Sequence, residues 1–463
     1  MAEAESITAP DISHIHRMSN GLTLVAEPMP WLRSAAFTLL VPAGTRSEPE
    51  GLQGLCGMTL DLAQRGAGKR NSRQIVEDLD YMGVERSSSC STFHTSFSVA
   101  CVAESLNETL EIYADMVLRP HMPEDEVDES RQTALQELLS IEDDPSQKVF
   151  TQLKNLRYGA QFGRSPYGSM EGLESVALEA MVDYHAGRYI PDGAILAVAG
   201  KFEWDEIKAI VEKLFSDWKS IETAPAEAVQ IHTGVQHLQH ESSQTHIALA
   251  YDCVPYQHPA FYQSRGLISV LSDGMSSRLF SEVREKRGLV YTVSASCQTI
   301  GNQGSVLTYA GTTGARAQET LDVTIETIKS LGNGISEGEL SRLKARVKSS
   351  LVMEQESSTS RSSQIATDWY YLKRVPNRKQ VLAEIESLTC ESLLEHFQQF
   401  PPKGWGLVTM GPEPVVLAED LISAASTSSG QCVDETTSLT DNLKSITSNS
   451  TLAKSTPAKG ATR

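Results

Sequence analysis

The stretch MPEDEVDESRQTALQELL at residues 122–139 has a counterpart in ISEGELSRLKARVKSSLV at residues 335–352. In each stretch, a turn residue and an acidic first turn precede a long helical pattern. Just upstream, Glu108-Thr-Leu-Glu matches Glu319-Thr-Leu-Asp, and both pairs are about 212 residues apart, which indicates an internal repeat. The apolar spacing that begins at Leu106 predicts an amphipathic helix before the first stretch.

The two halves also end alike. The strand-like GAILAVAG from Gly193 precedes an acidic helix start at Trp204, and WGLVTMGP from Trp405 stands at the matching place in the second half. Strand signals open each half before the long helices, at residues 22–27, 36–41 and 96–102 and again at 246–251 and 289–293. This order favours an α+β fold with two homologous α/β sandwich halves, each a largely antiparallel sheet with helices packed on one face.

Composition changes suggest the domain limits. We expect an N-terminal domain over residues 1–222, a linker over 223–232, where Pro225 interrupts any period, and a C-terminal domain over 233–425. From Ser426 to the end, 16 of 38 residues are Ser or Thr. With so little apolar content to bury, residues 426–463 are expected to form a disordered tail.

Charge and hydropathy narrow the functional class. The 463 residues carry a formal net charge of −19, which argues against a nucleic-acid-binding role and favours cationic partners such as basic peptides. No stretch approaches the roughly 18 apolar residues of a membrane span. The seven cysteines include no Cys-x-x-Cys, which favours a reducing compartment, and the first residues lack a targeting pattern. We therefore expect a cytoplasmic protein.

The segment LSDGMSSRLFSEVREKRGLVYTVSA, residues 271–295, combines a helix with a strand. Arg284 ends a helical run, Gly288 allows the helix to stop, and Tyr291 falls early on the next strand. A guanidinium and a phenol at such a site can donate hydrogen bonds to a peptide carbonyl or to its tetrahedral oxyanion. Taken alone, Arg284 would instead be part of a solvated charged face and Tyr291 an ordinary strand aromatic.

This segment, together with RMSNGLTLVAEPMP at residues 17–30 and VPAGTRSEPEGLQGLCGM at residues 41–58, resembles the pitrilysin and mitochondrial processing peptidase family of zinc metallopeptidases. That family carries His-x-x-Glu-His on a helix, where two His hold zinc and the Glu is the general base. The resemblance puts Gln53 and Gly57 at the His positions and Cys56 at the Glu position. All three are substituted, so the motif is degenerate.

The family's third zinc ligand corresponds to Glu137. Without the two histidines, this carboxylate alone does not hold a metal, and it also fits a solvated or interdomain helix face. Cys56 is expected to be a buried apolar thiol. We therefore expect neither a catalytic residue nor a metal in this chain. A zinc site at His237 and His240, which have ligand-like spacing, is a weaker alternative to a charged loop between the halves.

The resemblance assigns Arg284 and Tyr291 to substrate binding. It implies a peptidase-family protein that acts in proteolysis or peptide processing as the zinc-free subunit of a heterodimeric zinc metalloendopeptidase. The partner subunit would supply zinc and an intact motif, and the substrate would be a peptide or unfolded polypeptide. Activity is expected only with that partner. The alternative is a catalytically inert scaffold from the same family, and no Ser-His-Asp or Cys-His arrangement supports a third, zinc-free hydrolysis.

Overall fold

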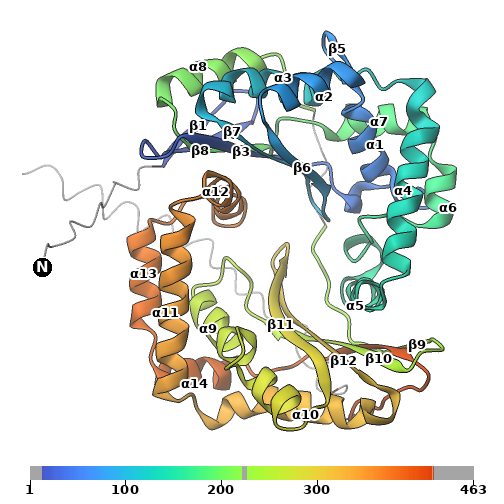
Figure 1. Ribbon diagram of the computed structural model, residues 1–463, viewed down its shortest axis with the longest axis vertical. Coiled ribbons are helices and arrows are strands. Elements are labelled where there is room, and N and C mark those ends of the chain that lie inside the picture. Colours follow the sequence, from blue (N-terminus) through green and yellow to red (C-terminus); the bar gives the residue numbers. More distant parts are fainter. Residues whose placement is uncertain (1–12, 222–226, 420, 422–463) are drawn as a thin grey trace, which may run out of the picture.

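The computed structural model describes residues 13–221, 227–419 and 421. This part of the chain forms two large sheets, one in each half, which face each other across the molecule (Figure 1). The strands of the first half are β1 (His14–Arg17), β2 (Thr23–Pro28), β3 (Ser34–Val41), β4 (Gly66–Ala67), β5 (Arg70–Asn71), β6 (Glu85–Cys90), β7 (Thr95–Val102) and β8 (Ile195–Gly200). Those of the second half are β9 (Gly234–Gln239), β10 (Gln244–Cys253), β11 (Val290–Ile300), β12 (Gln303–Thr313) and β13 (Gly406–Gly411).

The two sheets share the same order of five strands, to which β1 adds a sixth strand at one edge of the first sheet. The first runs β1-β2-β8-β3-β7-β6, and the second, read from its far edge, runs β9-β13-β10-β12-β11. β2 pairs with β8 in parallel and β9 pairs with β13 in parallel, while the other neighbouring strands of these sheets are antiparallel. The internal repeat and the α+β fold with two largely antiparallel halves are therefore confirmed.

Helices occupy corresponding positions in the two halves. The long helix predicted from each repeated stretch is present, as α4 and α11. The helices of the first half are α1 (Leu55–Ala63), α2 (Ser72–Tyr81), α3 (Leu106–Leu118), α4 (Val127–Glu142), α5 (Pro145–Phe162), α6 (Met170–Ser175), α7 (Leu178–Arg188) and α8 (Trp204–Phe215). Those of the second half are α9 (Phe261–Ser272), α10 (Ala317–Lys329), α11 (Glu337–Glu354), α12 (Ser358–Leu372), α13 (Arg378–Ser387) and α14 (Cys390–Gln399).

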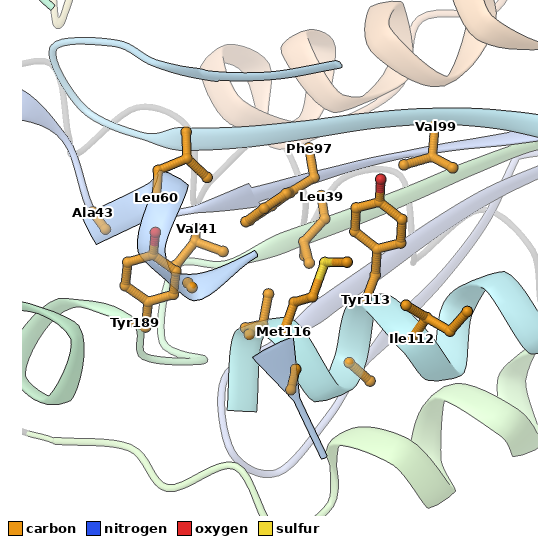
Figure 2. Close-up of a cluster of buried hydrophobic side chains, with 14 of the residues drawn as sticks. Leu39, Val41, Ala43, Leu60, Phe97, Val99, Ile112, Tyr113, Met116 and Tyr189 are labelled. Carbon is orange, nitrogen blue, oxygen red and sulfur yellow. The ribbon is translucent and has the colours of Figure 1, made fainter. Parts of the chain in front are cut away.

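Alternating strand residues build the core of the first half against its own helices. Leu39 of β3 and Phe97 of β7 are buried and point toward α3, where Tyr113 and Met116 meet them (Figure 2). The rings of Phe97 and Tyr113 pack edge to face with centroids 5.8 Å apart. This arrangement follows from the period of two along a strand and the apolar stripe of the helix.

The opposite face of each sheet is covered by a helix from the other half. Helix α12 packs on the first sheet, where Ile365 and Trp369 are buried against Val25 and Ile195 (Figure 1). Helix α5 packs on the second sheet in the same way, through the residues Val149, Leu153, Ala248, Ala250, Val408 and Met410. The expectation of helices on one face is thus incomplete, because the apolar inner faces need a cover that their own half does not provide.

A buried ion cluster fixes α12 to the first sheet. Glu27 of β2 is 2% exposed and accepts hydrogen bonds from Arg361 at 2.9 and 2.6 Å and from Arg378. Burial alone would raise the Glu27 pKa, but the two guanidinium groups outweigh it and lower that pKa below its usual value. Thr38 of β3 adds a buried hydroxyl contact to Ser362 at 3.1 Å.

Helix α5 carries a matching buried cation. Arg157 is fully buried and donates hydrogen bonds to Ser305 at 3.0 Å, to the Gly404 carbonyl and to Asp252. We call α5 and α12 the crossing helices, because each packs on the sheet of the other half. Each is therefore held by an arginine whose hydrogen-bond acceptors lie in the opposite half. Such contacts demand one arrangement of the two halves, since a buried charge without its partner is costly.

The predicted domain limits lie partly outside the described residues. This applies to residue 222 at the end of the expected N-terminal domain, to residues 223–226 of the expected linker and to the expected tail over 426–463. Within the linker, Val229 is buried and the His232 amide donates to the Arg157 carbonyl. Among the described helices, none is both long and apolar enough to cross a membrane.

We predict that Glu27→Gln destabilises the fold by about 3–5 kcal/mol, because it removes the buried carboxylate that Arg361 and Arg378 share. Denaturant unfolding of the full chain measures this change. Since the folded pKa of Glu27 lies below the ordinary value, its contribution is present above about pH 4.5 and is lost as the pH falls through the lowered pKa. The difference in the free energy of unfolding between variant and wild type should therefore become smaller at acidic pH.

The matched control is Glu77→Gln, which breaks an exposed ion pair to Arg73. It should change stability by less than about 0.5 kcal/mol. Equal effects of the two substitutions would contradict the structural role assigned to Glu27.

Candidate functional site

The degenerate zinc motif lies at the start of α1. Gly54 adopts a positive φ of 109°, and the helix begins only at Leu55. Gln53 therefore precedes the helix, and Gln53 and Gly57 do not share a helical face as the resemblance implies. The Gln53 backbone instead packs against residues 168–172, so tightly that a Cβ on Gly172 would lie 2.3 Å from the Gln53 carbonyl oxygen.

Cys56, at the position of the family's general base, is fully buried, as expected. Its thiol donates to the Ala43 carbonyl at 3.3 Å and lies 2.8 Å from the sulfur of Cys90, the last residue of β6. Thr95 approaches both sulfurs and donates to the same carbonyl at 2.6 Å. The thiol therefore faces the sheet.

Glu48 is a buried acid that the sequence analysis missed. One carboxylate oxygen accepts hydrogen bonds from the Gly54 and Cys56 amides at 3.1 and 2.9 Å, so it caps α1. The other oxygen, Oε2, is buried without a hydrogen-bond partner among the described residues. Burial raises the Glu48 pKa to about 7, although the two amides and Arg164 act in the opposite direction. The acidic turn before the helix start was the available signal.

Glu137 of α4 meets Gly57 in a pocket beside α1. Asp61 of α1 and residues 88–90 of β6 also line this pocket, which we call the α1 pocket. Glu137 is exposed, and partial burial followed by the charge of Asp61 raises its pKa. Asp61 is paired with Arg65 at 2.7 Å, whereas Glu137 has no ion pair within the described ranges. The structure thus brings together two of the predicted positions, Gly57 and Glu137.

The donor set of the α1 pocket does not fit zinc. Gly57 has no side chain, Gln53 lies outside the helix, and Cys56 does not line the pocket. A zinc site needs about three protein ligands for catalysis and about four for a structural role. Across the described parts of the chain, no group of three or more His, Cys, Asp or Glu is arranged to hold a metal ion.

Arg284 and Tyr291 lie on the second half. A short π-helix, Phe280–Glu285, carries Arg284, whose guanidinium lies 4.8 Å from the Phe280 ring centroid. Gly288 has a φ of 58°, which confirms the predicted helix stop, and Tyr291 is the second residue of β11. Tyr291 is 83% exposed, and its hydroxyl has no hydrogen-bond partner among the described residues. Neither side chain lines the α1 pocket.

A second pocket lies between the two halves and has a volume of about 390 Å³. Its lining comes from β6 and the following turn, from α5, from the end of β11 and from α12, and it includes Cys90, Phe93, His94, Lys154, Tyr158, Pro166, Ile300 and Tyr370. Burial, followed by the charges of Arg46 and Lys373, lowers the His94 pKa to about 3, and burial lowers the Lys154 pKa. Cys90 and Pro166 border both pockets, which makes them adjacent. Sequence patterns do not show this pocket because it depends on the crossing helices.

The prediction of a charged loop around His237 is wrong. Residues Gly234–Gln239 form β9, which pairs in parallel with β13, and His237 Nδ1 lies 2.9 Å from the Thr409 hydroxyl oxygen. Pairing with β13 gives order to a segment whose polar composition alone favours a loop.

Comparisons with known proteins agree with this geometry. Residues 24–168 match the family Insulinase (Peptidase family M16), and residues 175–347 match the Peptidase M16 inactive domain. The chain belongs to peptidase family M16. This pitrilysin-like membership confirms the resemblance found in the motifs, and the change from one matching segment to the other falls close to α6.

The similar proteins and the similar solved structures match this M16 protein over most of its length. The uncharacterized zinc protease YmxG of Bacillus subtilis is 27% identical, covering 85% of this chain and 97% of its own. An uncharacterized zinc protease of Mycobacterium leprae is 26% identical, covering 85% and 91%. A Helicobacter pylori protease matches in fold with a TM-score of 0.80 at 19% identity, covering 87% and 100%. A peptidase M16 inactive domain from Pseudomonas fluorescens has a TM-score of 0.79 at 18% identity, covering 88% and 99%.

We predict that Glu48→Gln changes how stability depends on pH. Because the folded pKa of Glu48 is raised above its ordinary value, the folded state holds this proton more tightly, and stability is lost as the pH rises from about 4.5 to about 7. The neutral Gln removes this loss. Urea unfolding at pH 5 and at pH 7.5 should show a smaller decrease for the variant, by an amount on the order of 1–3 kcal/mol. If the variant lost as much stability between pH 5 and pH 7.5 as the wild type, the raised pKa of Glu48 would be contradicted.

Proposed function

We propose that this M16 protein acts in proteolysis or peptide processing as the zinc-free, substrate-binding subunit of a heterodimeric zinc metalloendopeptidase. The observation that carries the proposal is the contrast between its two halves. The zinc-ligand positions of the first half have no usable ligand set, whereas Arg284 and Tyr291 of the second half are exposed and make no side-chain hydrogen bond or ion pair within the described residues. A partner with an intact motif would supply zinc, its water and the general base.

In this role, Arg284 and Tyr291 act on the partner's substrate. A guanidinium and a phenol are hydrogen-bond donors suited to the oxyanion that forms when water attacks a peptide carbonyl. Tyr291 sits at one edge of the second sheet, since β11 is its terminal strand, and the π-helix that carries Arg284 packs against that strand. An extended peptide can pair with such an edge through its backbone.

The charge of the chain favours a basic substrate. The net charge is −19, and in the α1 pocket Glu137 has no cationic partner among the described residues. A lysine or arginine of a peptide bound along β6 would offset that charge. The curated relatives named zinc proteases support a peptide substrate for the complex as a whole.

We predict that the purified chain alone does not cleave peptides and that adding an M16 subunit with an intact His-x-x-Glu-His produces cleavage. In the reconstituted pair, Tyr291→Phe should slow turnover by about 10²-fold or more, as for the loss of an oxyanion donor. Arg284→Ala should also slow turnover of the pair. Peptide turnover is measured together with complex formation by analytical ultracentrifugation.

The matched control is Tyr81→Phe, because Tyr81 of α2 is 92% exposed and lies on the outer helices of the first half. It should leave turnover unchanged. Wild-type turnover by Tyr291→Phe in an intact complex would instead favour the alternative, a catalytically inert scaffold of the same family. Robust cleavage by the chain alone would contradict the partner requirement.

A further inference from the structure

Two thiols meet where the family has its catalytic helix. Cys56 on α1 and Cys90 at the end of β6 are 34 positions apart in the sequence, yet their sulfurs lie 2.8 Å from each other. A disulfide has an S–S length of about 2.05 Å, so bonding requires the sulfurs to approach by about 0.8 Å. Neither α1 nor β6 needs to leave its place for a movement of that size.

The surroundings hold this pair together. Thr95 lies 3.5 Å from the Cys56 sulfur and 3.8 Å from that of Cys90, and the Ala43 carbonyl accepts from both the Cys56 thiol and the Thr95 hydroxyl. Cys56 is fully buried, whereas Cys90 is half-buried and borders both pockets. Cys90 is therefore the member of the pair that a small oxidant in either pocket would meet first.

We propose that Cys56 and Cys90 form a reversible disulfide that cross-links α1 to the edge strand β6. The oxidant is a low-molecular-weight disulfide. The Cys90 thiolate attacks one of its sulfurs and releases one small thiolate, which gives a mixed disulfide. Cys56 then loses its proton and attacks the Cys90 sulfur, releasing the second small thiolate. In total, two protein thiols are oxidised, one small disulfide is reduced to two thiols, and no further reactant is needed.

The cross-link would act on the wall of the α1 pocket. Ser88, Ser89 and Cys90 of β6 line this pocket, and the bond would tie them to the start of α1. The hydrogen bond from Cys56, together with burial, raises the Cys90 pKa, so the reduced pair reacts slowly and persists while the surroundings are reducing. Closing a loop of this length also restricts the unfolded chain, which stabilises the oxidised form.

The test is equilibration of the full native chain with mixtures of oxidised and reduced glutathione, followed by alkylation and peptide mapping by mass spectrometry. We expect a peptide that links Cys56 to Cys90, its loss at high reduced glutathione, and a higher midpoint of thermal unfolding for the oxidised chain. Mapping is required because Cys253 and Cys297 also share a thiol hydrogen bond.

Cys90→Ser should abolish both the link and the rise in the thermal midpoint, and Cys56→Ser should do the same if it folds. Cys390→Ser is the matched control, since Cys390 lies at the start of α14 in the second half, and it should retain both. Recovery of Cys56 and Cys90 as separately alkylated thiols after equilibration with oxidised glutathione would overturn the proposal. A stable adduct of glutathione on Cys90 without the internal link would overturn it as well.

Discussion

The exchange of helices α5 and α12 is the constraint on which the rest of the structure depends. Each sheet has an apolar inner face that its own helices do not cover, and each receives a helix from the other half. Buried arginines make the exchange specific, because Arg361 needs Glu27 and Arg157 needs Asp252. The pocket between the halves is a consequence, since both crossing helices contribute to its lining.

Loss of the metal position follows from local backbone geometry as well as from side-chain chemistry. The left-handed Gly54 delays the helix start, which removes Gln53 from the face of α1, and Gly57 leaves only space beside Glu137. The buried oxygen atoms of Glu48 and the sulfurs of Cys56 and Cys90 take up the interior around the helix start. The architecture is retained while the ligand set is absent, as the proposed role requires.

Much of the fold was predictable because the repeat is visible in local patterns. The stretches at residues 122–139 and 335–352 became α4 and α11, and the Gly288 helix stop is confirmed. The crossing helices were not predicted, because the apolar stripe of a helix in the sequence does not identify the sheet against which the helix will pack. Glu48, Cys90 and the pocket between the halves were missed since each depends on segments brought together only by folding. The loop reading of His237 failed because strand pairing with β13 outweighed local polarity.

The most direct test of the central claim is the metal content of the tag-free chain after incubation with equimolar zinc and removal of weakly bound metal. Glu137 is the one remaining residue of the family's ligand set, and a catalytic zinc requires about three protein ligands. The account predicts a zinc content near zero by elemental mass spectrometry, with a family member that has an intact motif retaining zinc under the same conditions. One tightly held zinc ion per chain would contradict the account.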